Sequence, residues 1–401
     1  MTISLTGSEA WWASKHGPEW VKEGEAWRVT FWWRDRDGAE ETSPWRHIWL
    51  CITGITDHHH HRQPLSLVRQ PGTDIWCADI LLPAQWRGSY CFIPSSQSND
   101  FAASVFKNAQ SVREEWQRLL PLAESDPLNP LSWMGGRGHL VSGLEMPDAP
   151  KQPGWNQLEA KYTPPKELTW QSPRLQNQRR VWIFTTGEAT ATDRPLAILL
   201  DGQFWAESMP VWPALSALTE SGDLPAAVYL LIDVIDGEHR SRELPCNREF
   251  WQAIQDELLP QVAAITPVSS VAKHTIVAGQ SFGGLAALYA GLHWPERFGG
   301  VLAQSGSFWW PDRKEQQIGW LRQQLDEGIV RADGLRIILQ AGKYEPLIFR
   351  ANDAIRHQLV AAAELGWCPF EGGHDAFCWR GGLTSGLIAL WHPLTAEIKT
   401  R

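Results

Sequence analysis

The stretch that decides the fold reads Thr275-Ile-Val-Ala-Gly-Gln-Ser-Phe-Gly-Gly-Leu-Ala-Ala-Leu-Tyr-Ala-Gly291. Its opening residues predict a buried strand, and the Gly-Gly-Leu-Ala-Ala-Leu segment that follows predicts a helix. Between them lies Gly279-Gln-Ser-Phe-Gly283, a G-x-S-x-G pattern. Glycines at this spacing allow a sharp turn from strand to helix that exposes the serine hydroxyl. The pattern therefore predicts that Ser281 is the nucleophile of an α/β-hydrolase domain.

Apolar runs on both sides of this stretch predict the rest of the sheet. They alternate with helical windows, an order that is typical of a mostly parallel sheet covered by helices. The predicted strands are residues 181–185, 196–200, 228–232, 275–278, 301–303 and 335–339, and the helical windows are 210–221, 248–264, 284–293, 315–327 and 347–365. Asn247 is predicted to cap the second helix and Gly366 to end the last. We expect the catalytic domain to cover residues 174–401.

The N-terminal part has a different pattern of polar and apolar residues. Short runs of alternating polarity, at residues 27–33, 47–52, 74–80 and 89–93, are separated by clusters of Gly, Pro and Asp. Alternation with a period of two at this spacing predicts an antiparallel β-sandwich over residues 1–120, with a helical piece near 111–120. Residues 121–173 are rich in Pro and Gly, and we expect them to form a long connection draped over the second domain.

A serine hydroxyl needs a general base to take its proton, and in this fold the chain order is nucleophile, acid, histidine. His374 follows a short late strand and a pair of glycines, so it is the predicted base. The other histidines that follow Ser281 lie on helices or near the C-terminus, where the placement suits catalysis poorly: His293, His357 and His392.

The acid that orients the histidine should follow the strand at residues 335–339. Glu345 is the preferred candidate because it comes just after that strand. Asp353 on the following helix and Asp375 beside the histidine remain alternatives, and surface charge is the simpler interpretation of both.

Two further features are expected near the nucleophile. The backbone N–H of Phe282 and one from Gly202 or Gln203 are the predicted oxyanion donors, whereas the side chain of Asp201 is expected to be structural. Residues 237–245 form a predicted loop after the strand at 228–232, and it carries Arg240 and Arg242. These arginines would place positive charge beside the nucleophile, which implies an anionic substrate.

Composition excludes several classes of function. The formal net charge of −9 and the lack of a basic run argue against nucleic acid binding. No run reaches the roughly 18 apolar residues of a membrane span, and the first residues do not resemble a secretory signal. The six scattered cysteines are expected to be reduced thiols in a cytosolic protein. His58-His-His-His61 is expected in an exposed loop, and no spacing elsewhere suggests a metal site or a cofactor.

The chain contains 25 tryptophans, which fit both core packing and a cleft for flat aromatic groups. Several strings around the predicted site resemble the enterochelin esterase family, and the N-terminal part resembles that family's immunoglobulin-like domain. The strings are Leu200-Asp-Gly-Gln-Phe-Trp205, His239-Arg-Ser-Arg-Glu-Leu-Pro-Cys246, Val277-Ala-Gly-Gln-Ser-Phe-Gly-Gly284, Trp294-Pro-Glu-Arg-Phe298, Gln304-Ser-Gly-Ser-Phe-Trp-Trp-Pro311 and Gly372-Gly-His-Asp375.

This resemblance implies a cytoplasmic enzyme that hydrolyses the trilactone of ferric enterobactin, a catecholate siderophore, to dihydroxybenzoylserine units. It places the nucleophile on Ser281, the base on His374 and a substrate contact on Arg240, and it leaves the acid open. Iron would belong to the substrate, so no enzyme cofactor is implied. The small-molecule substrate is the only partner expected, with neither nucleic acid nor membrane.

Other functions remain as alternatives at this stage. One is a carboxylesterase for feruloyl-type esters with a sugar-binding β-domain. A second is a siderophore-binding protein with a relict catalytic site, and a third is acyl transfer to another alcohol. Substrate comparison, covalent labelling of Ser281 and product analysis separate these alternatives.

Overall fold

The computed structural model describes residues 6–37, 40–57, 64–101, 108–136, 138–157, 159, 161–188, 193–312, 319–360 and 363–399. The histidine run at residues 58–61 lies outside them. The chain folds into two compact units, Met1–Pro150 with Glu371–Cys378 and Lys151–Phe370 with Trp379–Arg401. Among the described residues, no helix combines the length and apolar character that crossing a bilayer requires.

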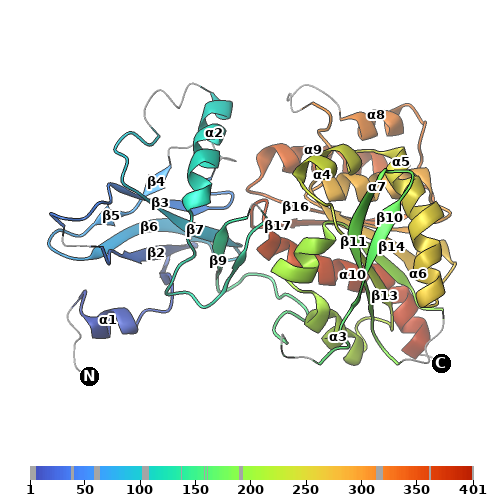
Figure 1. Ribbon diagram of the computed structural model, residues 1–401, viewed down its shortest axis with the longest axis horizontal. Coiled ribbons are helices and arrows are strands. Elements are labelled where there is room, and N and C mark those ends of the chain that lie inside the picture. The colour runs from blue at the N-terminus through green and yellow to red at the C-terminus, as the bar shows by residue number, and fades with distance from the viewer. Residues whose placement is uncertain are drawn as a thin grey trace. The chain divides into compact units, whose positions relative to one another are not determined.

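The first unit contains two antiparallel sheets (Figure 1). One has the order β1-β2-β6-β5, with bounds Glu19–Glu23, Ala26–Arg34, Ile75–Pro83 and Val68–Arg69. The other has the order β4-β3-β7-β9-β8, with bounds Leu65–Ser66, His47–Ile52, Arg87–Ser95, Leu140–Glu145 and Ser132–Met134. Along β2, Val29, Phe31 and Trp33 are buried while their neighbours are partly exposed. This period of two confirms the β-domain that the alternation predicts.

The boundary of this unit differs from the expected one. Residues 121–173, expected as a connection, contain β8 and β9, and β9 pairs with β7. The unit therefore extends to Pro150. Both strands are short and follow or flank several glycines, so their alternation is too brief to stand out in the sequence. The unit also includes the helices α1 (Glu9–Ala13) and α2 (Ala109–Leu119) and the 3-10 turn η2 (Leu120–Leu122).

The second unit is built on one eight-stranded sheet with the order β10-β11-β13-β12-β14-β15-β16-β17. The pairs β10–β11 and β11–β13 are antiparallel, and the remaining pairs are parallel. The bounds in chain order are Lys166–Ser172, Asn177–Thr185, Leu196–Leu199, Val228–Ile232, Thr275–Gln280, Gly300–Gln304, Arg336–Gly342 and Glu364–Phe370. The central strands are buried on both faces, as their continuous apolar runs predict.

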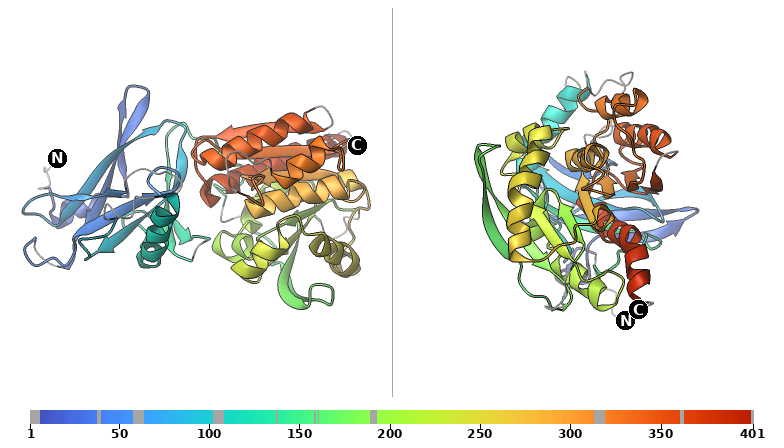
Figure 2. Two further views of the ribbon diagram at one scale, coloured as in Figure 1. Left: turned by 90° about the horizontal axis from the view of Figure 1, so that it is seen from above. Right: turned by 90° about the vertical axis from the view of Figure 1, so that its right-hand side faces the viewer.

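Helices cover both faces of this sheet (Figures 1 and 2). One face packs against α5 (Arg248–Ala253), α6 (Leu259–Ile265), α7 (Phe282–His293), α8 (Trp320–Asp326) and α9 (Pro346–Leu359). On the other face, Phe184 contacts Trp212 of α3 (Trp212–Glu220), and Tyr229 contacts Trp391 of α10 (Ala376–Lys399). This arrangement is the predicted α/β-hydrolase fold.

Three local predictions have different outcomes. The expected loop at residues 237–245 is largely a helix, α4 (Gly237–Glu243), because Asp236 caps it by accepting a hydrogen bond from the His239 N–H. Asn247 caps α5 as predicted, by accepting from the Phe250 N–H. The prediction that Gly366 ends a helix is wrong: α9 ends at Leu359, and Gly366 lies within β17. The chain from α5 to α6 passes through a π-helical turn, η4 (Ile254–Leu258).

Candidate active site

Ser281 occupies a strained turn between β14 and α7. Its backbone has φ 59° and ψ −119°, a conformation that costs a residue with a side chain about 1–3 kcal/mol. The turn is held by a hydrogen bond from the Ser281 N–H to the carbonyl of Gln304 at 2.9 Å. The sharp strand-to-helix turn predicted from the sequence is therefore present.

Gly279, two residues before Ser281, is required by the close crossing of strand and helix. A Cβ added to Gly279 would lie 2.5 Å from the backbone carbon and oxygen of Gly283. No side chain fits at that distance, so the pattern can carry only glycine at residue 279 without moving α7.

A second turn, Ser305–Ser307, lies directly beside the nucleophile turn. The Ser307 N–H donates to the carbonyl of Ser281 at 3.0 Å, and the two serine hydroxyl oxygens are 3.4 Å apart. The Ser305 N–H donates to the carbonyl of Gln340 in β16 at 2.6 Å. This turn thus connects the end of β15 to the nucleophile on one side and to β16 on the other.

Glu345 lies between β16 and α9 and is 1% exposed. Its Oε1 accepts hydrogen bonds from the Ser305 hydroxyl at 2.5 Å and from the Gly342 N–H at 2.7 Å. The Ser305 hydroxyl oxygen accepts in turn from the indole N–H of Trp379 at 2.9 Å. A buried carboxylate with two donors on one oxygen is held in one orientation. Glu345 is therefore connected through Ser305 to the turn that contacts Ser281.

The other two candidate acids have different surroundings. Asp353 lies on α9, where its carboxylate pairs with Arg356 at 2.6 Å and its side chain is 41% exposed. Asp375 is buried, and its oxygens accept hydrogen bonds from Ser89 and from the Phe377 N–H. Of the three carboxylates, the connection to the nucleophile turn favours Glu345.

His374 lies in the connection between β17 and α10. It is half-buried, and its two neighbours along the chain, Gly373 and Asp375, are buried. The segment Glu371–Cys378 belongs to the first unit, whereas Ser281 and Glu345 belong to the second. The role of His374 as the base therefore stays a prediction.

His293 has the structural role that its position on a helix indicates. Its ring packs against Tyr289 with centroids 4.1 Å apart and stacks on Trp320 with an interplanar angle of 7°. Burial, assisted by the nearby Arg248, lowers the pKa of His293. A neutral ring within an aromatic cluster fits packing better than proton transfer.

The predicted oxyanion donors lie at two turns of the second unit. Phe282 is the first residue of α7, and the first N–H groups of a helix have no carbonyl partner within it. Gly202 follows β12 directly after Asp201, which has a positive φ of 54°. Both positions follow strands that pair in parallel, β12 with β14. Their role as donors stays a prediction, since it depends on a bound substrate.

Arg240 is tied to the nucleophile turn by a network that the sequence did not reveal. Its Nε and Nη2 donate to the two carboxylate oxygens of Asp201 at 2.5 and 2.9 Å. The side chain of Gln280, the residue before the nucleophile, donates to Asp201 at 3.2 Å. The guanidinium carbon also lies 5.8 Å from the ring centroid of Phe282. The charge of Arg240 is thus partly offset by Asp201, which we expected to be merely structural.

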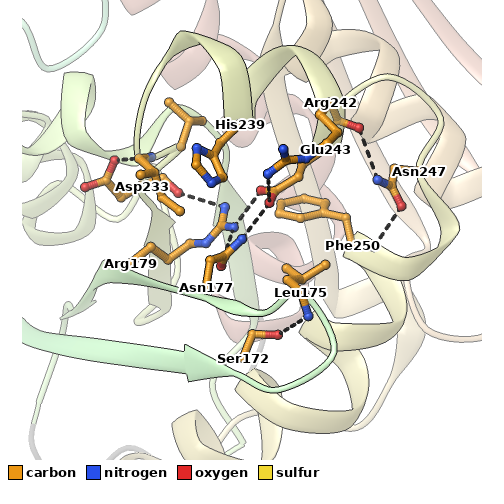
Figure 3. Close-up of polar contacts among 12 residues, drawn as sticks. Ser172, Leu175, Asn177, Arg179, Asp233, His239, Arg242, Glu243, Asn247 and Phe250 are labelled. Atoms are coloured by element: carbon orange, nitrogen blue, oxygen red, sulfur yellow. Dashed lines mark hydrogen bonds and ion pairs between the residues drawn. The ribbon is translucent and has the colours of Figure 1, made fainter.

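Helix α4, which carries Arg240, is anchored by a buried ion pair (Figure 3). Arg179 of β11 donates to Glu243 at 2.6 Å, and these side chains are 1% and 4% exposed. The Asn177 side chain donates to the other oxygen of Glu243 at 2.8 Å. Arg179 also lies 5.5 Å from the ring of Trp170. A paired and hydrogen-bonded charge can be buried in this way, and it fixes α4 to β11.

Arg242 lies on the same helix but has a different environment (Figure 3). Its side chain is 55% exposed, 3.7 Å from Glu238 and 4.0 Å from Glu243. The structure therefore brings Arg240, and not Arg242, into the network around Ser281. Within the described ranges, no group of three or more His, Cys, Asp or Glu residues is placed to hold a metal ion.

Sequence reasoning missed the contributions of Asp201, Ser305 and Ser307. One signal was available: all three follow strands adjacent to the nucleophile strand, and the carboxyl ends of parallel strands share one edge of a sheet. The Ser-Gly-Ser string after the strand at residues 301–303 could have been placed beside Ser281 on this ground.

Comparison with known proteins agrees with this geometry. Sequence models of the families described as "Enterochelin esterase, N-terminal" and "Putative esterase" match residues 28–155 and 172–390. The iron(III) enterobactin esterase of Escherichia coli O6:H1 (strain CFT073) is 60% identical to this chain, covering 98% of it and 99% of the relative. The chain belongs to the iron(III) enterobactin esterase family.

Solved structures of this enterobactin esterase family extend the likeness to the whole fold. A crystal structure of ferric enterobactin esterase from Salmonella typhimurium matches with a TM-score of 0.94 at 58% identity, covering 97% of this chain and 100% of that one. The Shigella flexneri enterobactin esterase, crystallised in the presence of enterobactin, matches with a TM-score of 0.89 at 57% identity, covering 98% and 100%. The α/β-hydrolase fold with an N-terminal β-domain is thereby confirmed.

Proposed function

We propose that this chain hydrolyses the ester bonds of ferric enterobactin, with Ser281 as the nucleophile, and releases dihydroxybenzoylserine units. The observation that carries the proposal is the strained Ser281 turn, present in a chain 60% identical over nearly its whole length to an iron(III) enterobactin esterase. Iron enters and leaves as part of the substrate and its products.

In the proposed reaction, the imidazole of His374 takes the proton from the Ser281 hydroxyl as the oxygen attacks an ester carbonyl of the trilactone. The tetrahedral intermediate collapses when the bond from its carbon to the substrate's serine oxygen breaks, and the imidazolium gives this proton to that oxygen, which leaves as a hydroxyl group. Water, activated by the same imidazole, then attacks the acyl-enzyme and releases a carboxylic acid. Each cycle consumes one water and cleaves one ester bond.

Three groups support these steps in the proposal. The N–H groups of Phe282 and Gly202 stabilise the negative charge that develops on the carbonyl oxygen. Glu345 stabilises the imidazolium and holds the ring in the tautomer that can accept the serine proton. The two hydrogen bonds on Glu345 Oε1 suit this role because they fix the carboxylate before substrate binds.

Substrate recognition in the proposal combines charge with aromatic surface. A ferric tris-catecholate is a trianion with flat rings, and it meets a cation at Arg240. The ring of Phe282 lies 5.8 Å from this guanidinium and 5.9 Å from the ring of Trp309. Catecholate rings stack on such surfaces, and the arginine supplies charge-assisted hydrogen bonds. Arg242 would contribute only long-range attraction from its exposed position.

The Ser281→Ala variant tests the nucleophile. We expect turnover, followed by chromatography of dihydroxybenzoylserine products, to fall by about 10⁴-fold or more, because nucleophile and base act as a unit. Binding of ferric enterobactin, followed by tryptophan fluorescence, should remain near that of the wild type. His374→Ala should match this loss, whereas His357→Ala, on the exposed surface of α9, should not. Turnover of Ser281→Ala at the wild-type rate would refute the assignment.

Further measurements separate the alternative functions. A fluorophosphonate that labels Ser281 argues against a relict site, and slow turnover of a feruloyl ester relative to the trilactone argues against a general carboxylesterase. Free acid rather than a new ester among the products identifies hydrolysis rather than acyl transfer. We further propose that the enzyme acts in the cytoplasm, where freed iron is available for reduction. Cell fractionation tests this location.

A further inference from the structure

The segment Glu371–Cys378, which carries His374, belongs to the esterase region by sequence but packs within the first unit. We infer that strand β7 of the N-terminal β-domain holds the loop of the proposed base through Ser89 and Asp375, so that the β-domain takes part in positioning the catalytic machinery. This inference rests on the proposed function, in which His374 is the base. It makes Ser89 and Asp375 positioning residues for the hydrolysis.

The side chain of Asp375 is the centre of this attachment. Its Oδ2 accepts hydrogen bonds from the N–H of Ser89 at 2.5 Å and from the Ser89 hydroxyl at 2.7 Å. Its Oδ1 accepts from the N–H of Phe377, in the first turn of α10, at 2.8 Å. The same carboxylate therefore binds β7 with one oxygen and caps a helix with the other. The residue directly before this doubly held aspartate is His374.

Contacts with Arg87 and Gly54 hold the segment on both sides of His374. The N–H of Arg87 donates to the carbonyl of Glu371 at 3.0 Å, and the thiol of Cys378 donates to the carbonyl of Arg87 at 3.1 Å. Gly373 lies so close to the β-domain that an added Cβ would be 2.9 Å from the Cα of Gly54. Attachments before and after His374 leave its backbone little freedom.

Because Asp375 is buried, its attachment to Ser89 depends on keeping the hydrogen-bond donors of the carboxylate as well as on the fit of the side chain. Asp375 is 3% exposed, and its burial raises the pKa of the carboxyl, opposed by the hydrogen bonds from Ser89 and Phe377. Removing a donor from a buried carboxylate leaves an unsatisfied polar group, so the loop would move to satisfy it. A general base must lie within hydrogen-bond reach of its proton, and small displacements of such groups reduce rates strongly.

The first unit also supplies a matched control, Asp126. It is a buried carboxylate like Asp375, and it accepts hydrogen bonds from the Tyr90 hydroxyl at 2.6 Å and from the Leu128 N–H at 2.8 Å. Tyr90 follows Ser89 directly in β7, so both carboxylates are attached to the same strand. Asp126, however, makes these bonds within the chain before residue 150, and not to the segment of His374.

The experiment compares Asp375→Asn, Ser89→Ala and Asp126→Asn in the full-length protein. Thermal unfolding is measured for each variant, together with the second-order rate of fluorophosphonate labelling at Ser281 from pH 5 to pH 9, at a temperature where all are folded. We expect Asp375→Asn to slow labelling by about 10- to 100-fold and Ser89→Ala by a smaller factor. Asp126→Asn should lower the unfolding midpoint but keep labelling within about twofold of the wild type, because its bonds do not reach the base.

A double variant distinguishes an effect of Asp375 through His374 from a general loss of structure. If Asp375 acts through His374, then adding Asp375→Asn to His374→Ala should cause no further loss of labelling, since residues that act as a unit are not additive. The inference would be overturned if Asp375→Asn slowed labelling as much in the His374→Ala background as in the wild type. It would also be overturned if Asp126→Asn slowed labelling as much as Asp375→Asn does. Should Asp375→Asn fail to fold, Ser89→Ala decides: labelling at the wild-type rate would also overturn it. Failure of the proposed function would look different, because His374→Ala itself would then label normally.

Discussion

Arg240 and Asp201 form a two-bond ion pair directly beside the nucleophile turn, with N···O distances of 2.5 and 2.9 Å. A planar guanidinium matches a carboxylate in this way, whereas an ammonium group cannot. We therefore expect Arg240→Lys, although it keeps the charge, to raise KM for ferric enterobactin by about 10-fold or more. Arg242→Ala, on the exposed side of α4, should change KM by less than about threefold. Steady-state kinetics at two ionic strengths measures both; equal effects of the two variants would argue against a special role of Arg240.

Asp201 is expected to matter through the same pair. Asp201→Asn keeps the shape but loses the charge, and Arg240 then lacks the partner that orients it. We expect kcat/KM to fall while thermal stability changes little. The amide introduced at residue 201 keeps a carbonyl oxygen for Gln280, and Arg240 keeps its contact with the backbone carbonyl of Gln280. A crystal structure of the variant would show whether Arg240 has moved. An unchanged kcat/KM would argue against a role of the ion pair in orienting Arg240 for catalysis.

Glu345→Gln should lower kcat by about 100-fold or more, since a neutral amide cannot stabilise the imidazolium. Ser305→Ala removes one of the two donors to Glu345 Oε1, and we expect a smaller loss of about 10-fold. The control is Asp353→Asn, whose carboxylate pairs with Arg356 at the surface of α9. A larger loss of kcat in Asp353→Asn than in Glu345→Gln would transfer the role of the acid to Asp353.

The buried pair Arg179–Glu243 gives a prediction about stability. Either Arg179→Met or Glu243→Gln leaves its partner unpaired in the interior, which should cost about 3–5 kcal/mol in the free energy of unfolding. The double variant Arg179→Met/Glu243→Met should recover most of this loss, because no charge then remains buried. Chemical denaturation measures the effect. The exposed pair Arg174–Glu249 is the control, and Arg174→Ala should leave the midpoint close to that of the wild type.

Asp126 gives a prediction about pH. Burial raises the pKa of its carboxyl in the folded state, so the folded protein keeps a proton that the unfolded chain loses near its ordinary value. The stabilisation is fully present below a pH of about 4 and is lost as pH rises through the folded pKa. The wild type should therefore lose stability relative to Asp126→Asn as the pH rises above about 4. Thermal midpoints at several pH values test this; a wild-type advantage that grows with pH would contradict the direction of the shift.

The structure agrees with the sequence where a local pattern carried the information. The strands around Ser281 consist of continuous apolar residues, which a sheet buried on both faces requires at every position. Gly279 marks the turn itself, because a Cβ there would clash with the backbone of Gly283 where β14 and α7 cross. Asn247 marks the start of α5 because its side chain replaces a missing backbone acceptor.

The predictions failed where the signal was short or non-local. Helix α4 has no apolar periodicity, so its charged sequence resembled a loop, although Asp236 caps it and Glu243 anchors it. Gly366 resembled a helix stop but lies in β17, where it packs against Ile338 of the neighbouring strand. A local cap together with a tertiary ion pair decided the first case, and strand pairing decided the second.

By itself, the sequence determined the two kinds of domain, the nucleophile turn and the set of candidate acids, because strand periodicity, glycine spacing and chain order are local properties. Only the tertiary structure decided that Asp201 pairs with Arg240, that Ser305 connects Glu345 to the nucleophile turn, and that Ser89 holds Asp375. These partners lie between 39 and 286 positions apart in the chain. Hydrogen bonds and ion pairs depend on distances of a few ångströms in space, which no local pattern of residues encodes.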